Sequence, residues 1–424
     1  MSDTTTTVAK TTPASTSRSR VFVQKLLLIF LGFFSGAVVV EIALRLAGYS
    51  FPEFYQVDEY RGYALRPGAQ GWYRKEGEAY VTINSDGLRD REHTKDKPQN
   101  TVRVALVGDS YPEALPVSLE SAFWLVMERK LQDCDAASGR TIEVINFGVS
   151  GYGTAQELIT IRERVWQYQP DLVLLAVTTS NDITDNSRAL KGTDRVPYFV
   201  LRQSQLVLDD SYRRSRSFRF QQSRIAYIGR WFRDNLRVVQ ALGQAHSALR
   251  IQIASWRQHL TTSPKTESQT EEKSDLLARS AELGNDNLVY SAPQNQVWID
   301  AWLVTESLLK QINQEVGERG AKLVVVTVSN APQVIPDPKV RKRFSERFMV
   351  DDLFYPDHRL KTLCESESIP VVILAPELQT YAELNKVFLH GFGENLGSGH
   401  WNVAGHRVAG ELLAQKICGA GLLK

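Results

Sequence analysis

The chain has 424 residues, 43% of them hydrophobic and 23% charged, which is the composition of a globular protein with enough apolar material for a sizeable core. Its 50 Lys and Arg residues nearly balance its 48 Asp and Glu residues, so the net charge of +2 argues against a general nucleic-acid-binding protein. The 3 scattered cysteines, without a CxxC pair, exclude a disulfide-rich scaffold and give no sign of a zinc site. They leave open which two would form a single disulfide outside the cytoplasm.

The N-terminus carries a candidate membrane anchor. Residues 1–20 are rich in Ser and Thr and include basic residues, and the stretch 26–44 is apolar except for Glu41. An α-helix of that length is about 28 Å long, close to the hydrocarbon thickness of a bilayer. We therefore predict a disordered cytoplasmic tail over residues 1–20 and a transmembrane signal-anchor helix over 21–46.

The basic residues precede this span, so the positive-inside rule predicts a cytoplasmic N-terminus and an extracytoplasmic main domain. A cleaved signal peptide is the alternative. It is disfavoured because the apolar stretch is longer than a usual signal-peptide core and no small-x-small cleavage site is evident.

Residues 50–100 predict a small β-rich cap or linker in front of the main domain at 101–424. The segment is polar and rich in turn residues, with a strand signal at 79–83 (AYVTI) followed by a turn signal at 84–87 (NSDG).

Five short apolar, β-branched runs follow. Their hydrophobic residues do not alternate with polar ones, which predicts strands buried on both faces, and the segments between them have helical spacing. A strand followed by a helix, repeated, is typical of a parallel α/β sheet. The predicted strands are 102–107, 142–147, 172–177, 323–328 and 371–374, and the predicted helices are 120–131, 155–168, 297–320 and 358–367.

A long, helical insertion separates the third and fourth predicted strands, at about 183–296. It contains the basic, aromatic stretch 212–237 (YRRSRSFRFQQSRIAYIGRWFRDNLR) and the charged polar tract 261–275, which reads as a flexible loop. The basic stretch could touch anionic lipid headgroups, acidic glycans or nucleic acid. The favoured interpretation is a solvated helical face with Phe and Trp turned inward, and nucleic acid is the least favoured partner.

Polar residues follow the predicted strands at the edge where open parallel sheets bind ligands. Singly, each has an ordinary explanation: a serine at a helix start is usually an N-cap, and a lone histidine is more often structural than catalytic. Together they provide a nucleophile, a base and donors for an oxyanion. They are Asp109 and Ser110 in VGDS, Gly151 in NFGVSGYGT, Asn181 and Asp182 in TTSNDITDN, and His400 and His406 in GSGHWNVAGH.

In this order the four blocks resemble those of the SGNH/GDSL hydrolases, over about residues 102–418 apart from the insertion. The resemblance implies an α/β, flavodoxin-like, doubly wound five-stranded parallel sheet, the SGNH hydrolase fold, in agreement with the strand pattern. It also implies a role for each residue. Ser110 would be the nucleophile and His400 the general base, the backbone amides of Ser110 and Gly151 and the side chain of Asn181 would form the oxyanion hole, Asp109 would hold the serine loop, and His406 would be structural.

One position departs from the family pattern. Three residues before the catalytic His, where the family usually has an Asp that orients the imidazole, this chain has Gly397, and the nearest upstream carboxylate is Glu394. A backbone carbonyl or a distant acid could orient the ring instead. Asp357 and His358 form another carboxylate and imidazole pair, although their segment reads better as the start of a helix.

Other enzyme classes lack their signatures here. Ser110 is not in a G-x-S-x-G elbow, which disfavours an ordinary α/β-hydrolase. The sequence has no Walker loop or GxGxxG, so no nucleotide cofactor is indicated, and we expect neither a cofactor nor a metal.

The leading hypothesis is a membrane-anchored, extracytoplasmic serine esterase that acts on acyl groups, such as acetyl, of a glycan or lipid. An O-acyltransferase with a membrane or polysaccharide-assembly partner is a variant of it. The Gly397 departure motivates a second hypothesis, a catalytically weak SGNH domain that binds glycans or assists assembly. A third is a flavodoxin-like domain with coincidental loop residues, which predicts that Ser110, Gly151, Asn181 and His400 are scattered.

Overall fold

The computed structural model describes residues 18–203, 205–261 and 284–423. Most of the predicted N-terminal tail and of the polar tract 261–275 therefore lies outside the described residues. The chain divides into two compact units, one formed by Met1–Ser50 with Phe232–Leu260 and the other by Phe51–Trp231 with Thr261–Lys424.

The first unit contains α1 (Arg18–Leu46) and α9 (Arg237–Thr261). Within α1, Val21–Leu46 is long and apolar enough to cross a membrane, and none of its most apolar window is buried. Near the end of α1, the Glu41 carboxylate accepts a hydrogen bond from the backbone N–H of Val238 at 2.9 Å. Arg45 donates to the carbonyl oxygen of Asn235 at 2.7 Å. These two contacts join Asn235, just before α9, and Val238, at its start, to the end of the apolar helix α1.

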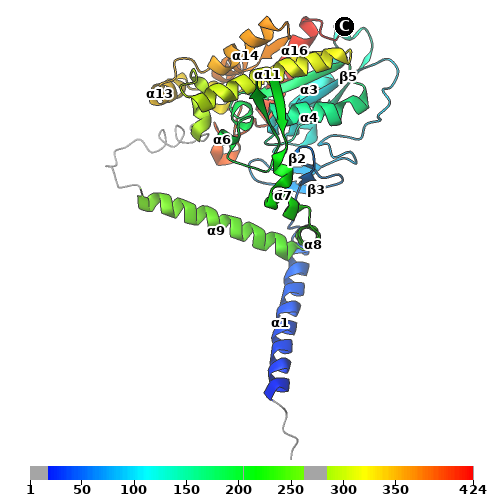
Figure 1. Cartoon of the computed structure of the whole chain (residues 1–424), viewed down its shortest axis with the longest axis vertical. Helices are drawn as coiled ribbons and strands as arrows, with labels where there is room; N and C mark the ends of the chain where they lie inside the picture. The colour runs from blue at the N-terminus through cyan, green and yellow to red at the C-terminus, as the bar shows by residue number, and fades with distance from the viewer. Residues whose placement is uncertain (1–17, 204, 262–283, 424) are drawn as a thin grey trace, which may run out of the picture. The chain divides into compact units, whose positions relative to one another are not determined.

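The second unit, whose strand β5 is labelled in Figure 1, is built on a five-stranded parallel sheet. The order of its strands is β11-β10-β7-β5-β6. Numbered along the chain and read from β6, this order is 2-1-3-4-5, the flavodoxin-like doubly wound arrangement. The predicted fold class is thus confirmed, and each predicted strand is found within one or two residues. The strands are β5 (Thr101–Gly108), β6 (Thr141–Asn146), β7 (Leu172–Thr178), β10 (Lys322–Val328) and β11 (Val371–Ile373).

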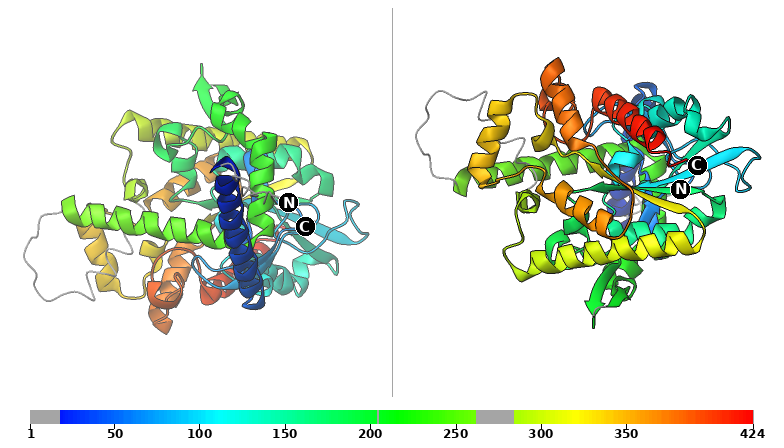
Figure 2. Two further views of the ribbon diagram at one scale, coloured as in Figure 1. Left: turned by 90° about the horizontal axis from the view of Figure 1, so that it is seen from below. Right: turned by 90° about the horizontal axis from the view of Figure 1, so that it is seen from above.

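Helices cover both faces of the sheet because its central strands are apolar on both sides. In β5, Val104 and Leu106 join one hydrophobic core, whereas Ala105 and Val107 join the other. Side chains of successive strand residues point to opposite faces, so a continuous apolar run needs cover on each. Figure 2 shows α16 (red) and α11 (yellow) on opposite sides of the sheet. The first core is covered by α3 (Phe123–Gln132), α15 (Ala375–Asn385) and α16 (Val403–Gly419), and the second by α4 (Thr154–Glu163), α11 (Gln296–Glu318) and α14 (Tyr355–Ser366).

Some helices and strands of the structure were not predicted from the sequence. The helices α12 (Ala331–Val334), α13 (Pro338–Phe348) and α15 were not anticipated. The insertion is also not purely helical, because the short helices α5 (Asp182–Asp185) and α6 (Arg188–Lys191) are followed by an antiparallel hairpin of β8 (Tyr198–Arg202) and β9 (Gln205–Asp209). It continues with α7 (Arg216–Gln221) and α8 (Arg224–Asn235).

The segment before the sheet contains two antiparallel strand pairs. These are β1 (Tyr55–Asp58) with β2 (Gly62–Leu65), and β3 (Gln70–Tyr73) with β4 (Ala79–Thr82). Phe54, Leu65 and Val81 from this segment share a hydrophobic core with Leu115 and Val149 of the main domain. The strand pairs, called the cap below, are therefore packed onto the loops that follow β5 and β6. The domain boundaries drawn from the sequence stay a prediction.

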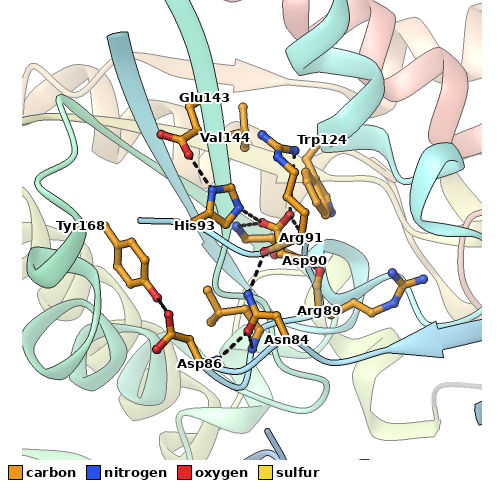
Figure 3. A network of polar contacts seen from close by, with 12 residues as sticks. Asn84, Asp86, Arg89, Asp90, Arg91, His93, Trp124, Glu143, Val144 and Tyr168 are labelled. Atoms are coloured by element: carbon orange, nitrogen blue, oxygen red, sulfur yellow. Dashed lines mark hydrogen bonds and ion pairs between the residues drawn. The ribbon is translucent and has the colours of Figure 1, made fainter. Parts of the chain in front are cut away.

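A buried ionic network joins the chain that follows the cap to the edge of the sheet (Figure 3). The His93 ring lies 2.6 Å from a Glu143 oxygen on β6 and 3.1 Å from an Asp90 oxygen. Burial opposes protonation of His93, but its ion pairs with Asp90 and Glu143 prevail and raise its pKa to about 9. Glu143 also accepts a hydrogen bond from the buried Arg103 at 2.7 Å.

One disulfide joins Cys134, just after α3, to Cys418 in α16, with 5.8 Å between their Cα atoms. Cys364 is a buried free thiol. The bond covalently links two helices that pack on the same face of the sheet, one from the start of the domain and one from its end.

The His93 network predicts a specific pH dependence of stability. The folded-state pKa of about 9 exceeds the ordinary value of 6.5, so the stabilisation is complete below about pH 6.5 and is lost as the pH rises through about 9. It amounts to on the order of 3 kcal/mol at most. We expect His93→Gln to lower the denaturation midpoint at pH 6 and to flatten its decline toward pH 10, measured by denaturant unfolding. His358→Gln, at an exposed histidine, is the control, and an unchanged profile in His93→Gln would contradict the network.

Candidate active site

Ser110 lies two residues after the interior strand β5, at the edge formed by the carboxyl ends of the strands. Asp109 is the N-cap of the short helix α2 (Ser110–Glu113) and accepts a hydrogen bond from the backbone N–H of Tyr111 at 3.1 Å. This cap places the serine at the first position of the helix, where its backbone N–H lacks an intrahelical partner.

His400 comes from the other end of the chain and lies in a loop held by backbone contacts. His390 and Trp401 form a β-bridge, and the N–H of Gly391 donates to the carbonyl oxygen of His400 at 2.9 Å. Burial lowers the pKa of His390 to about 4, so this ring is neutral. Its Nδ1 lies 2.7 Å from the Gly399 carbonyl oxygen and donates to it.

The side chains of Ser110 and His400 are in contact. Nε2 of His400 lies 2.7 Å from Oγ of Ser110, and Nδ1 of His400 lies 2.8 Å from Oε2 of Glu76. With the proton on Nδ1, the ring donates to the Glu76 carboxylate and its Nε2 accepts from the Ser110 hydroxyl. This is the geometry of a carboxylate, imidazole and hydroxyl relay in which the acid orients the base and the base activates the nucleophile.

The contact between His400 and Glu76 shifts the pKa values of both side chains. Burial opposes protonation of His400, but the hydrogen bond and the charge of Glu76 prevail, and the pKa of His400 is raised. Burial raises the pKa of Glu76, but the hydrogen bond to the His400 ring prevails, so that pKa is lowered. Glu76 is therefore ionised at neutral pH and stabilises a positively charged His400.

Glu76 is the distant acid that the sequence analysis left unnamed. It lies in the turn between β3 and β4 of the cap, more than 300 positions before His400 in the chain. Gly397, at the position of the family's Asp, has a φ of +87° and its N–H donates to the carbonyl oxygen of His390. Residues with a Cβ rarely adopt this left-handed conformation, so the loop is built without an acid at that position.

Gly151 lies in the loop after β6, and two neighbours fix the peptides on either side of it. The Tyr63 hydroxyl of β2 donates to the carbonyl oxygen of Ser150 at 2.8 Å, which fixes the peptide whose N–H belongs to Gly151. Lys191 donates to the carbonyl oxygen of Gly151 at 2.6 Å and pairs with Asp185 at 2.8 Å.

The conformation of Gly151 explains why this position has no side chain. Its φ of +74° is in the left-handed region, and an added Cβ would lie 2.8 Å from the Tyr63 hydroxyl. The N–H of Val149, in the same loop, donates to the carbonyl oxygen of Gly108 at 3.1 Å. The loop is thereby held beside the start of the serine helix.

Asn181 follows β7, and its side chain is joined to the serine loop. Nδ2 of Asn181 donates to the buried carboxylate of Asp109 at 2.9 Å. The same carboxylate accepts from the Thr178 hydroxyl at 2.9 Å, and burial raises its pKa against the effect of these hydrogen bonds. One amide hydrogen of Asn181 is thus used to bind Asp109, and the second is left for another acceptor.

The remaining candidates lie apart from this relay. His406 is buried in α16, where its Nδ1 accepts from the Phe123 N–H at 3.2 Å, and burial lowers its pKa to about 3. Asp357 is buried in α14 and accepts hydrogen bonds from Thr327 and Gln333. The exposed His358 contacts Asp352 instead.

Asp182 also does not join the relay. It accepts a hydrogen bond from the backbone N–H of Thr178 at 2.6 Å, and its pKa is raised by burial and by the neighbouring Glu157. In the described part of the chain, no group of three or more His, Cys, Asp or Glu residues could hold a metal ion.

No protein-family model matches this chain, and no curated protein matches it significantly. Solved structures do match. They include a lipase/acylhydrolase from Enterococcus faecalis, with a TM-score of 0.34, 12% identity and coverage of 75% of this chain and 96% of that one. An acetyl xylan esterase from Geobacillus stearothermophilus matches with a TM-score of 0.35, 12% identity and coverage of 76% and 97%.

A protein from Desulfitobacterium hafniense, proposed to be a lipolytic member of the G-D-S-L family, matches with a TM-score of 0.33, 11% identity and coverage of 74% and 99%. The matched structures thus include the family that the four sequence blocks resemble.

The contact between Glu76 and His400 predicts how the pKa of His400 responds to a substitution. Replacing Glu76 by Gln removes the carboxylate that favours the protonated ring, so we expect the pKa of His400 to fall, measured by NMR titration of its ring carbons. Glu78→Gln is the matched control, because Glu78 lies in the same hairpin but pairs with Arg74. An unchanged pKa in Glu76→Gln, or an equal fall in Glu78→Gln, would contradict the assignment of Glu76.

Proposed function

We propose that this protein is a serine esterase of the SGNH/GDSL type, with Ser110 as nucleophile, His400 as general base and Glu76 as the acid that orients His400. The observation that carries the proposal is the continuous chain of hydrogen bonds from the Glu76 carboxylate through the imidazole to the Ser110 hydroxyl. A free serine hydroxyl is a weak nucleophile and becomes effective when a positioned imidazole takes its proton.

In the first half of the reaction, Oγ of Ser110 attacks the ester carbonyl carbon and its proton moves to Nε2 of His400. The carbonyl oxygen becomes an oxyanion, which the backbone N–H groups of Ser110 and Gly151 and the side-chain amide of Asn181 stabilise by hydrogen bonds. The intermediate collapses, the bond to the alcohol oxygen breaks, and His400 gives its proton to that oxygen. The products are the free alcohol and an acyl ester of Ser110.

In the second half, water replaces the alcohol. The water oxygen attacks the acyl carbon while His400 takes a proton from the water. When the bond between the acyl group and the serine breaks, His400 gives that proton to Oγ of Ser110. The carboxylic acid leaves and the serine is regenerated. Glu76 keeps its charge throughout and stabilises the imidazolium that forms twice in each cycle.

A location outside the cytoplasm, with α1 as a single membrane anchor, is supported by two features. The Cys134–Cys418 disulfide suits an oxidising compartment. The apolar span Val21–Leu46 follows basic residues, and by the positive-inside rule this favours a cytoplasmic N-terminus. An enzyme so placed would meet acylated glycans or lipids at the cell surface, and we propose acyl esters, such as acetyl, of these molecules as substrates.

Glu76 removes the main reason for the alternative of a catalytically weak binding domain. That hypothesis rested on the missing acid at Gly397, and a carboxylate now lies 2.8 Å from the catalytic imidazole. The hypothesis of coincidental loop residues requires Ser110 and His400 to be scattered, whereas they are 2.7 Å apart.

The nucleophile is tested by Ser110→Ala. We expect the variant to lose labelling by a fluorophosphonate probe and to hydrolyse p-nitrophenyl acetate at least about 10³-fold more slowly, because the attacking oxygen is absent. Ser118→Ala removes an exposed hydroxyl and is the control. Hydrolysis that persists in Ser110→Ala at the wild-type rate would rule out the proposed enzyme.

The oxyanion hole is tested by Asn181→Ala. Loss of one donor typically lowers kcat by about 10²- to 10³-fold. We expect a fall in kcat of this size with a much smaller change in KM, measured by steady-state hydrolysis of the same ester, because the donor acts mainly in the transition state. A change confined to KM would indicate that Asn181 binds the substrate instead.

A further inference from the structure

Helix α8 presents a row of large hydrophobic side chains to the surface. Their exposed fractions are 73% for Ile225, 65% for Tyr227, 54% for Ile228, 52% for Trp231 and 45% for Phe232. Ile225, Ile228 and Phe232 follow the i, i+3, i+7 spacing of one helix face, and Tyr227 and Trp231 flank it. These five residues are called the α8 face below.

The α8 face departs from the interpretation favoured from the sequence. That interpretation turned Phe and Trp inward, and of these residues only Phe218 is buried, with its ring against that of the buried Tyr212. Phe220, Trp231 and Phe232 are exposed. A soluble surface rarely gathers so many large apolar residues in one place without a binding function.

Arginines accompany the α8 face. The stretch 216–235 contains Arg216, Arg219, Arg224, Arg230 and Arg233, and Asp234 is its acidic residue. Arg219 and Arg230 donate to the backbone carbonyl oxygens of Arg214 and Gln221, respectively. No ion pair involves Arg216 or Arg224 in the described part of the chain. The composition is that of a helix that lies in a membrane interface, with aromatic and aliphatic residues on one face and arginines around it.

Helix α8 ends beside the end of the apolar helix α1. Its last residue, Asn235, accepts the hydrogen bond from Arg45 at 2.7 Å, and Arg45 is the penultimate residue of the span Val21–Leu46. At about 1.5 Å per residue, Trp231 lies about 6 Å and Ile225 about 15 Å along the helix from that point. Because the chain is continuous from Ile225 to Asn235, the α8 face lies within about 15 Å of chain from the end of the proposed anchor, whatever the orientation of the rest of the domain.

We propose that α8 is an interfacial helix that lies on the membrane beside the anchor, with the α8 face among the acyl chains just below the headgroups and its arginines at anionic lipid phosphates. The proposal rests on the proposed membrane anchor and adds to it a second, in-plane contact. Membrane lipid is the occupant that the charge of the stretch and its continuity with α1 favour. Such a contact restricts the esterase domain to substrates near the membrane surface.

The test uses the full-length chain in lipid nanodiscs that contain phosphatidylglycerol and phosphatidylcholine. Cys134 and Cys418 are disulfide-bonded and Cys364 is buried, so a nitroxide label reacts selectively with an introduced surface cysteine. Ile228→Cys places the label on the α8 face, and Leu384→Cys, at an exposed leucine of α15, is the control. Collision with oxygen, which concentrates in lipid, is compared with collision with a water-soluble nickel complex.

We expect the ratio of oxygen to nickel collisions to be several-fold higher at residue 228 than at residue 384, and to fall at residue 228 in nanodiscs of phosphatidylcholine alone. Equal ratios at the two positions in nanodisc-bound protein would overturn the interfacial helix and leave the anchor and the esterase untouched. Failure of the chain to enter nanodiscs would contradict the anchor and the interfacial helix together. Hydrolysis of p-nitrophenyl acetate by the same samples reports on the esterase separately.

Discussion

The hydrogen bond between the Glu76 carboxylate and Nδ1 of His400 is the contact on which the proposed active site depends. The ring can accept a proton from Ser110 only when its Nε2 is unprotonated and faces the hydroxyl, and the acid enforces both conditions from the opposite side of the ring. In this chain the acid does not come from the loop that carries the histidine. It comes from a hairpin turn at the other end of the chain, so the arrangement exists only when that hairpin is docked.

The cap is therefore part of the proposed active site. Its Glu76 binds the imidazole of His400, and its Tyr63 fixes the peptide that carries the Gly151 N–H. A third contact runs from the Tyr55 hydroxyl to the buried carboxyl of Glu113, at the end of the serine helix, at 3.0 Å. Burial raises the pKa of Glu113 to about 8 despite its hydrogen bonds, so this carboxyl is largely protonated at neutral pH. A change in the packing of the cap would alter the base, the oxyanion donors and the serine helix together.

The fold could be predicted from the sequence because a sheet covered on both faces produces continuous apolar runs, such as 172–177, that few other structures require. The ends of those strands then pointed to Ser110, Gly151 and Asn181 as candidate site residues, since ligands bind at the carboxyl edge of such a sheet. Glu76 could not be found in this way. It lies in an exposed turn between Lys75 and Glu78, in a segment where carboxylates are common and no local pattern marks one of them. Its role arises from a contact between distant parts of the chain, and Gly397 signalled only that the usual acid was missing.

The account is tested most directly by a crystal structure of the protein after reaction with a fluorophosphonate. It predicts phosphorus bonded to Oγ of Ser110, a phosphoryl oxygen within hydrogen-bond distance of the N–H groups of Ser110 and Gly151 and of Nδ2 of Asn181, and Glu76 still bound to His400. An adduct on another residue, or a Glu76 carboxylate turned away from the imidazole, would contradict it.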